Sequence, residues 1–338
     1  MDIFNANPFS MVELTAAVNK LPTIPTALGD LGLFTVKRIR TKTASFEENE
    51  GSIKLIPTSL RGAPLTQRGR DVRKLRSLTA PRIAKADKIT ASELSDVRAL
   101  GSETELAQVQ TEVARRMSAL RGDVSLTWEN MRLGAVQGVV KDADGSDLYN
   151  LYDTFNVTHS EEVDFDLDNA SPLPGALRTK CSEIVRATRR ACGNAWDIRR
   201  SYVMGLCDDT FWDQLIAHPE VRNTYLNTSE AAEQRGDRHT GMLSFGGIMF
   251  MHYPGTDDTT VRVPTGTCKF FPVDMAGDFW QAVFSPGEFL DAIEDAAKEM
   301  YALTIRDRDR NAFVDLEVYS YPLFVCTRPA ALQRARNT

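Results

Sequence analysis

The sequence predicts an α+β protein built from two or three packed units, and three observations lead to this expectation. The chain has 338 residues, and chains above roughly 250 to 300 residues usually split into more than one packed unit. A long helical pattern follows residue 102, with strand-like alternating runs on both sides of it. The composition, 42% hydrophobic and 25% charged, is typical of a globular protein that builds a sizeable core.

The first 90 residues predict an extended region without a core of its own. Prolines and glycines within residues 1–34 allow at most a short helix around residues 11–20. Residues 35–90 hold strand-like runs and the polar stretch 60–83, LRGAPLTQRGRDVRKLRSLTAPRI. Because unstructured loops beyond about 12 to 15 residues are usually functional or disordered, we expect this one to become ordered against a partner.

A long helix is predicted from Ser102 onward. Ser102 and Glu105 form a capping box, in which hydroxyl and carboxylate bind free amide groups at a helix start. Apolar residues then recur at three- and four-residue steps, which corresponds to roughly 50 Å of helix at about 1.5 Å per residue. They are Leu106, Val109, Val113, Met117, Leu120, Val124, Trp128, Met131 and Ala135.

The rest of the chain mixes both periods. Asp144-Gly145 predicts a tight hairpin, because this pair accepts positive φ angles. A second helix is expected over 174–192, and Asp208 or Asp209 is expected to cap a third. Residues 287–303 look helical by composition. Further strands are predicted for 201–207, 245–253, 266–273 and 313–327.

Charge is distributed unevenly along the chain. Residues 37–88 hold 14 Lys or Arg and five Asp or Glu, a net charge of +9, which leaves −15 for the remainder of a chain whose total is −6. The negative total argues against a general nucleic-acid binder. The basic segment is compatible with a nucleic-acid patch, and equally with a segment that docks on the acidic body of the next subunit.

The residue patterns of enzymes and metal proteins are missing from the sequence. It contains no nucleophile elbow, phosphate-binding loop or dinucleotide fingerprint. Five cysteines form no C-x-x-C pair, so we expect buried thiols and neither disulfides nor zinc. The four histidines show no metal-ligand spacing. No catalytic residue, metal or cofactor is therefore predicted, and the absence of an apolar span or secretory signal favours folding in a cytosol.

Two acidic segments could in principle bind a metal ion, but their sequences do not favour a metal site. In a calcium loop beginning at Asp142, the sixth and twelfth positions should be Gly and Glu, but they are Asp147 and Asp153. Residues 161–168 place aspartates at alternate positions, which on a strand would share one face. We favour a half-buried strand with an acidic solvated edge and with inward Val163, Phe165 and Leu167.

The order of these features resembles the lambda-like major capsid protein family, phage major capsid protein E. The segment 56–83 carries the family's proline, R-G-x-P-like turn, spaced basic residues and closing proline. The closing segment 316–336 resembles the family's last strand and arginine-proline ending, and VDFDLD and SFGGIMFMHYPG resemble its middle strands. The matching positions in 56–83 are Pro57, Arg61, Gly62, Pro64, Arg68, Arg70, Arg73, Lys74, Arg76 and Pro81.

The resemblance implies the Hong Kong 97-type capsid fold. Such a fold has an N-terminal arm, an extended E-loop, a peripheral domain with a long spine helix, and an axial domain. It also allows only a short helix within 287–303 before strands resume. The implied boundaries are 1–35 for the arm, 36–90 for the E-loop, 91–194 and 286–338 for the peripheral domain, 100–138 for the spine helix, and 195–285 for the axial domain.

The resemblance further implies a structural protein of the virion. Its partners would be itself, in hexameric and pentameric capsomers, together with a separate scaffold, a portal and, in some shells, a decoration protein. The icosahedral shell would assemble in the host bacterial cytoplasm and enclose double-stranded DNA without sequence-specific binding and without a membrane. The E-loop residues expected at the inter-subunit contact are Arg61, Arg68, Arg70, Arg73, Lys74 and Arg76.

Two other functions remain as alternatives. A nucleic-acid-binding protein would use the basic segment 61–76, but bases stack on aromatic side chains, and residues 47–127 contain no Phe, Tyr or Trp. A divalent-metal hydrolase would use Asp142 to Asp168, yet that region lacks the clustered histidines such sites commonly recruit. Both alternatives are therefore weaker than the shell protein.

Overall fold

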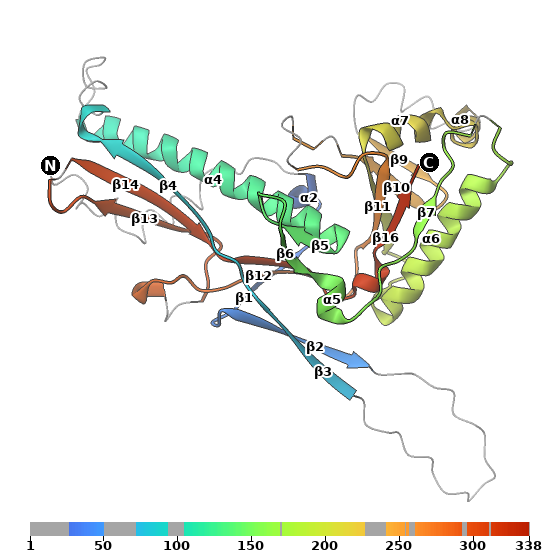
Figure 1. Ribbon diagram of the computed structural model, residues 1–338, viewed down its shortest axis with the longest axis horizontal. Coiled ribbons are helices and arrows are strands. Elements are labelled where there is room, and N and C mark those ends of the chain that lie inside the picture. The colour runs from blue at the N-terminus through green and yellow to red at the C-terminus, as the bar shows by residue number, and fades with distance from the viewer. Residues whose placement is uncertain are drawn as a thin grey trace, which may run out of the picture.

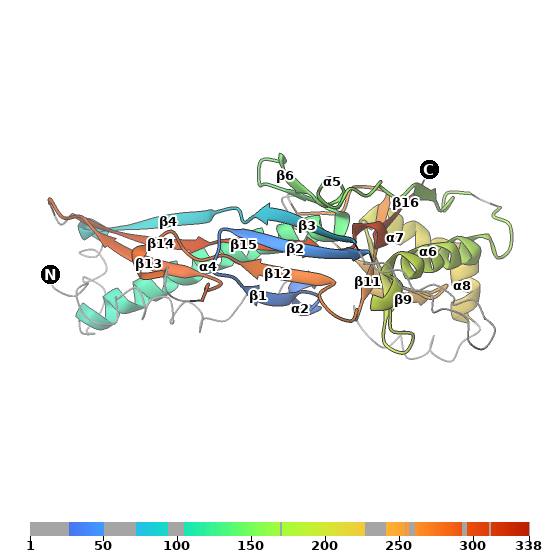
Figure 2. The ribbon, with the colours of Figure 1, turned by 90° about the horizontal axis from the view of Figure 1, so that it is seen from below.

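The computed structural model describes an elongated molecule with a hairpin projecting from one side (Figure 1). A long helix, α4, runs beside two small sheets, and a larger sheet with its own helices lies at one end (Figures 1 and 2). Among the described helices, none combines the length and apolar composition that crossing a bilayer requires. The structure describes residues 27–50, 72–93, 105–169, 171–226, 241–253, 255–256, 261–292, 296–310 and 312–337.

Helix α4 (Glu105–Gln137) is the long helix that the apolar periodicity predicts. Its predicted capping residue, Ser102, lies outside the described residues. The helix packs one face on the main core, where Trp128 meets Phe284 edge to face with ring centroids 5.4 Å apart. Its predicted core positions from residue 113 onward are all buried, namely Val113, Met117, Leu120, Val124, Trp128, Met131 and Ala135.

Two three-stranded sheets pack beside α4. One has the strand order β13, β14, β4 and the other the order β1, β12, β15. Strand β14 alternates buried and half-buried residues, as expected for a strand covered on one face, whereas β12 and β15 are buried throughout. Their bounds are Thr35–Arg38 for β1, Ile83–Thr90 for β4, Trp280–Phe284 for β12, Tyr301–Arg306 for β13, Phe313–Ser320 for β14 and Pro322–Cys326 for β15.

A six-stranded sheet with the order β7, β16, β11, β8, β10, β9 forms the other unit. Helix α6 (Ala176–Cys192) covers it with a strongly amphipathic face, and Figure 1 shows α7 and α8 at its upper end. This unit has its own core, which includes Phe165, Phe211 and Phe270. The strand and helix bounds are Glu162–Asp164 for β7, Tyr202–Cys207 for β8, Met242–Phe245 for β9, Ile248–His252 for β10, Thr267–Val273 for β11, Gln333–Arg336 for β16, Asp209–Ala217 for α7 and Pro219–Leu226 for α8.

A short hairpin and helix connect the two units. Strands β5 (Val139–Lys141) and β6 (Asp147–Asn150) pair antiparallel around Gly145, whose φ is 85°, so the predicted Asp-Gly hairpin is confirmed. Helix α5 (Leu151–Phe155) follows directly, and the side chain of Asn150 caps it by accepting a hydrogen bond from the Tyr152 amide. The predicted Asp208 cap of α7 is also confirmed, since its carboxylate accepts from the Thr210 amide.

The single strand predicted over 313–327 is wrong. The chain forms two strands, β14 and β15, which break at Tyr321 and belong to different sheets. The apolar alternation continues across the break because both strands contribute to the same core. Pro322 lies at the first residue of β15, where a strand tolerates the missing amide donor.

Two further expectations need correction. Strand β7 ends at Asp164, and Asp166 has a φ of 53°, so the aspartates of 161–168 do not share one strand face; Phe165 and Leu167 are nevertheless buried. Among the described residues of 287–303, which leave out 293–295, the one helical stretch is the short 3-10 helix Leu290–Ala292, and β13 begins at Tyr301. The helix expected from composition is therefore wrong, and the short helix that the resemblance implied is confirmed. The helix expected around residues 11–20 lies outside the described residues.

Candidate interaction surface

The projecting hairpin, formed by β2 (Thr43–Glu50) and β3 (Val72–Thr79), is the candidate functional surface. The two strands pair antiparallel over their whole length, from Thr43 opposite Thr79 to Glu50 opposite Val72. Figure 1 shows the hairpin extending away from the body of the molecule. An isolated two-stranded hairpin is marginally stable in water, so this one depends on what its two faces contact.

The inner face of the hairpin packs on the body near its base. Ala44 and Phe46 are buried, and the Phe46 ring meets Phe155 of α5 edge to face with centroids 6.2 Å apart. Leu78, which is opposite Ala44 in the register, packs against the same core. Burying an aromatic side chain of this kind contributes about 1.5 to 3 kcal/mol to stability. The base of the hairpin is therefore anchored to α5.

The outer face of the hairpin carries an uncovered apolar residue. Because strand residues alternate between faces, Ser45, Leu75 and Ser77 lie on the side opposite Phe46. The Leu75 side chain is 71% exposed, and its two serine neighbours are exposed as well. Single exposed leucines are common on protein surfaces. This one stands out because it lies on a projecting element with few other ways to gain stability.

The hairpin is fixed at both ends by strands of two different sheets. The incoming strand β1 pairs parallel with β12, and the outgoing strand β4 pairs antiparallel with β14 along eight residues. The Ala80 amide donates to the Lys42 carbonyl across the base at 3.2 Å. The direction of the hairpin is therefore set by the relative position of these two sheets.

Arg116 of α4 holds the outgoing strand. Its guanidinium donates to Glu112 and Glu93 at 2.7 Å each and to the Lys88 carbonyl of β4 at 2.6 Å. A third carboxylate, that of Asp87, lies 3.3 Å away. Hydrogen bonds from Arg115 and Arg116 lower the pKa of Glu112 to about 2. The charged cluster thus ties the start of the long helix to the strand that leaves the hairpin.

Glu129 of α4 holds the segment that precedes β1. Its side chain is 3% exposed and accepts hydrogen bonds from the Leu28 amide at 2.7 Å and the Gly29 amide at 3.2 Å. These amides belong to α2 (Ala27–Asp30), whose first turn they open. The Tyr253 hydroxyl also approaches the carboxylate, at 3.4 Å. A buried carboxylate without such donors would be strongly unfavourable, so Glu129 fixes α2 on the long helix.

The residues predicted for an inter-subunit contact lie in and beyond this hairpin. Arg61, Arg68 and Arg70 lie outside the described residues. Arg73 lies in β3, opposite Asn49. Lys74 and Arg76 also lie in β3, half-buried, and Arg76 is opposite Phe46 in the register. The structure thus brings the last three of the six into one strand.

Sequence reasoning missed Leu75, although a signal for it exists. In VRKLRSLT the two leucines are three residues apart, so a strand must place them on opposite faces. Once Leu78 packs on the core, Leu75 must point away from it. Glu129 was missed as well, because its partners Leu28 and Gly29 are 101 and 100 residues away along the chain.

In the part of the chain that the structure describes, the thiols and carboxylates form no metal-binding cluster. Within the described residues, no group of three or more His, Cys, Asp or Glu could hold a metal ion. All five cysteines are buried and unpaired by disulfides. Burial raises the pKa of both Cys181 and Cys192 to about 12, which disfavours the reactive thiolate.

Several solved structures share the fold. The capsid protein of cyanophage P-SCSP1u superimposes with a TM-score of 0.55 at 12% identity, covering 94% of this chain and 90% of that one. The putative capsid protein of a prophage of E. coli CFT073 gives 0.54 at 10% identity, covering 98% and 99%. The predicted α+β capsid fold is therefore confirmed.

Sequence comparisons place the chain more closely. The chain belongs to the phage major capsid protein E family, whose sequence pattern matches residues 10–337. It is similar to the major capsid protein of Salmonella phage Felix O1, with 25% identity over 97% of this chain and 96% of that protein. It is also similar to that of Pseudomonas phage KPP10, with 26% identity over 96% and 98%. The chain is thus a structural protein of a viral shell and not an enzyme.

Proposed function

We propose that this chain forms the icosahedral head of a tailed phage, in hexameric and pentameric capsomers that enclose double-stranded DNA, and that the β2–β3 hairpin binds across a neighbouring subunit. The observation that carries the proposal is the hairpin itself. It is anchored firmly at its base, it projects from the body, and it presents the exposed Leu75 on its outer face. An extended element of this kind gains stability when a second chain covers it.

The proposed contact combines apolar burial with charge. Covering Leu75 would remove apolar surface from water, worth about 25 cal/mol per Å². The segment 37–88 has a net charge of +9, and the remainder of the chain carries −15. Five cations of the segment pair with carboxylates of the same chain, namely Lys37, Arg38, Arg82, Lys85 and Lys88. The other cations of the segment would meet acidic surface of the next subunit. Exposed ion pairs contribute about 0 to 1 kcal/mol each, so charge sets direction and register more than strength. Head-to-tail contacts of this type close into rings.

The proposal also assigns the two packed units. The six-stranded sheet with α6, α7 and α8 is proposed as the axial domain, and α4 with the two three-stranded sheets as the peripheral domain. The predicted axial range, 195–285, contains β8 to β11, whereas β7, α6 and β16 of the same sheet unit lie outside that range. Residues 1–35 are proposed as an arm whose base is held by Glu129 at α2.

Further partners follow from the same proposal. Assembly would use a separate scaffold, as the resemblance to this capsid family implies. A portal and, in some shells, a decoration protein would complete the head. Assembly would take place in the host bacterial cytoplasm, and the enclosed DNA would be held without sequence-specific contacts.

Replacing Leu75 with aspartate tests the proposed contact. The variant should fold, because the side chain is 71% exposed, but it should form at least about tenfold fewer shells, since a loss of about 1.4 kcal/mol is tenfold in an equilibrium constant. Sedimentation velocity and negative-stain electron microscopy, with a scaffold co-expressed, measure shells, and circular dichroism checks folding. Leu173→Asp is the matched control, because it makes the same change at a side chain that is 78% exposed and lies outside the hairpin. If Leu75→Asp forms shells in the same yield as the wild type, the proposed role of this face is contradicted.

A further inference from the structure

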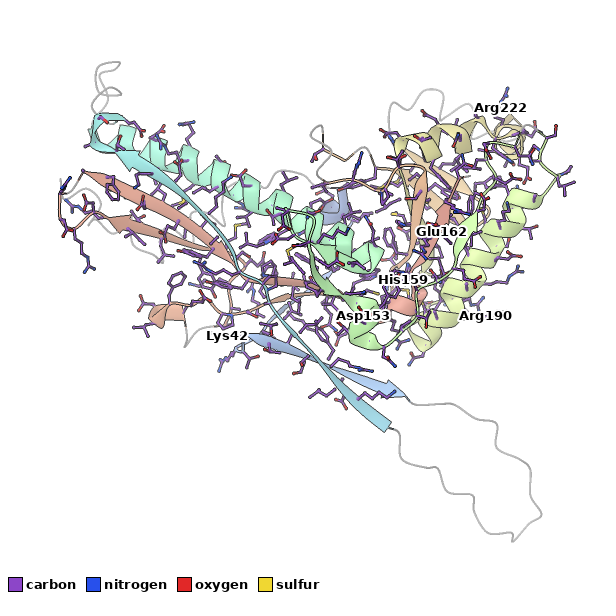
Figure 3. The ribbon with its side chains drawn as sticks, in the orientation of Figure 1. Lys42, Asp153, His159, Glu162, Arg190 and Arg222 are labelled. Atoms are coloured by element: carbon purple, nitrogen blue, oxygen red, sulfur yellow. The ribbon has the colours of Figure 1, made fainter. Side chains whose placement is uncertain are left out.

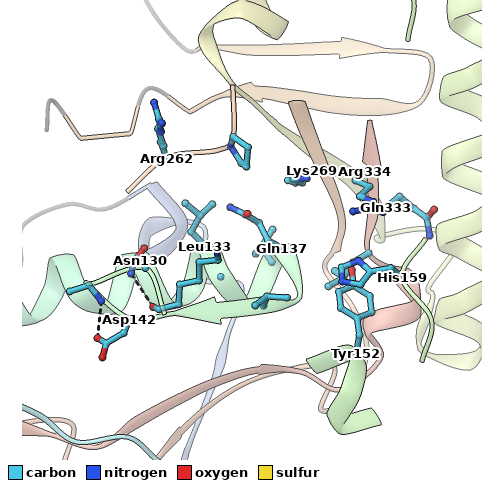
Figure 4. A pocket seen from close by; sticks show the side chains of 18 residues that line it. Asn130, Leu133, Gln137, Asp142, Tyr152, His159, Arg262, Lys269, Gln333 and Arg334 are labelled. Atoms are coloured by element: carbon cyan, nitrogen blue, oxygen red, sulfur yellow. Dashed lines mark hydrogen bonds between the residues drawn. The ribbon is translucent and has the colours of Figure 1, made fainter. Parts of the chain in front are cut away.

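A cavity of about 420 Å³ lies between the two packed units. Its walls come from the last turns of α4, the β5–β6 hairpin, and the neighbouring strands β11 and β16, with Pro264 and Arg262 on a further side (Figure 4). Its volume falls in the range of about 300 to 1,000 Å³ that is common for small-ligand sites. The interaction surface described above does not include this cavity.

The lining is strongly basic. Four of its side chains are cationic, namely Lys141, Arg262, Lys269 and Arg334, whereas Asp142 supplies the one lining carboxylate. Lys269 and Arg334 are direct neighbours, since they occupy opposed positions of β11 and β16. Figure 4 shows them together with His159 at one end of the cavity, away from Asp142 and Asn130.

Lys141 reaches the Asp147 carboxylate at 4.0 Å, whereas Lys269 and Arg334 form no ion pair with a carboxylate among the described residues. Asp142 accepts a hydrogen bond from the Ala143 amide at 2.8 Å within its own turn. Arg334 donates through Nε to the Ser160 carbonyl at 3.1 Å, and in the described part of the chain its other N–H groups have no acceptor. Among the described residues no carboxylate forms an ion pair with Lys269, although Glu162, which is opposite Arg334 in the β7–β16 register, acts on Lys269 through space. Two adjacent cations therefore line the cavity without a direct ion pair to a carboxylate.

Burial and nearby charges both act on the protonation of groups that line the cavity. Burial is the main cause that lowers the pKa of Lys269, whereas Glu162 raises this pKa and Arg334 lowers it. Partial burial, together with Arg334 and Lys269, also lowers the pKa of His159. The His159 ring stacks on Tyr152 with centroids 3.6 Å apart, which holds the imidazole at the cavity wall. An anion bound between these groups would favour the protonated form of both and so oppose these shifts.

We propose that this cavity is a phosphate-binding site in which Lys269 and Arg334 hold the anion, with Arg262 at the opposite wall. Guanidinium and ammonium groups bind phosphate oxygens through short charge-assisted hydrogen bonds. The phosphate would come either from free inorganic phosphate or from the backbone of enclosed DNA. In both cases the recognition is independent of base sequence.

The test is a titration of wild-type protein with inorganic phosphate, against chloride at equal ionic strength. The His159 ring resonance, assigned through His159→Gln, is followed by NMR across pH with histidine-selective labelling. Phosphate should shift this resonance saturably and move its titration midpoint upward, because a bound anion favours imidazolium. A resonance that responds equally to chloride and phosphate would overturn the proposal without any variant.

Variants then test the named residues. The double change Lys269→Gln and Arg334→Gln should weaken phosphate binding at least about tenfold, since hydrogen bonds to charged groups are the strong ones. The matched control is Lys42→Gln with Arg222→Gln, which also removes one Lys and one Arg, from exposed positions well away from His159 (Figure 3). If the double variant does not fold, Arg262→Gln, whose side chain is exposed, takes its place. Unchanged affinity in the cavity variant would overturn the assignment.

A short DNA duplex distinguishes the two sources of phosphate. A duplex that shifts the His159 resonance and competes with inorganic phosphate assigns the site to the DNA backbone. A response to inorganic phosphate alone assigns it to the free anion. If an acidic peptide shifts the His159 resonance while inorganic phosphate and the duplex do not, the cavity binds carboxylates and the proposal is overturned.

Discussion

At the scale of single residues, two charged side chains of α4 fix the segments on either side of the projecting hairpin. Glu129 receives two backbone amides from α2, and Arg116 reaches three carboxylates and a carbonyl around β4. The hydrogen bonds of both side chains are strong, because hydrogen bonds to charged groups are roughly twice as strong as neutral ones. The cluster around Arg116 contains titratable carboxylates, so its contribution to stability can be tested by changing the pH.

The stability that Arg116 contributes should depend on pH. The pKa of Glu112 is lowered from its ordinary value near 4.5 to about 2 in the folded chain. A lowered folded-state pKa stabilises the fold above the unfolded pKa and loses that effect as pH falls through the folded one. We therefore expect the free energy of unfolding of the wild type to be about 1 kcal/mol larger than that of Arg116→Met above pH 5. This difference should shrink between about pH 4.5 and 2.

Urea unfolding at a series of pH values, followed by circular dichroism, measures this difference. Arg222→Met on α8 serves as the control, because it removes an exposed guanidinium outside the cluster. If the difference in free energy of unfolding between wild type and Arg116→Met stays constant from pH 6 down to pH 2, the role given to Glu112 is contradicted.

At the scale of elements, the turn after α4 depends on glycine. Gly138 has a φ of 88°, and a Cβ there would overlap the Tyr152 ring of α5. Gly145, in the β5–β6 turn, has a φ of 85° but nothing within 4 Å of its Cβ position. Gly145→Ala should therefore cost about 1 kcal/mol from the backbone alone. Gly138→Ala should cost about 1 to 3 kcal/mol more, measured as a lower midpoint of thermal unfolding; equal losses in the two variants would rule out the overlap.

Elements with a local signal were predictable and those set by distant contacts were not. The long helix followed from its apolar spacing, and the hairpin at Gly145 from its Asp-Gly pair. The break at Tyr321 was missed because the apolar alternation runs through it, although Pro322 marks it. The end of β7 was not predicted, because no residue next to Asp166 in the sequence indicates its left-handed backbone conformation. The charge of the candidate surface was visible in the sequence, but its exposed apolar residue required knowledge of which face packs.

At the scale of the whole molecule, charge separates the segment 37–88 from the rest, with +9 against −15. Changing Arg68, Arg70 and Arg73 to glutamate tests whether this separation drives assembly. The variant should fold but should assemble only at high salt, because repulsion is screened over a Debye length of about 3 Å at 1 M. Electron microscopy and circular dichroism read out the two properties. Shells that form normally at low salt but retain less nucleic acid would instead assign these arginines to nucleic-acid binding.

The order in which the strands pair has a consequence for synthesis of the chain. Strand β1 pairs with β12, β4 with β14, and β7 with β16, so every one of these early strands waits for a partner made much later. Strand β16 lies between β7 and β11, and the largest sheet remains divided until residue 336 has been translated. A partly made chain on the ribosome therefore lacks the finished large sheet. If the proposed hairpin contact requires that finished body, we expect association to wait until each copy is nearly fully translated.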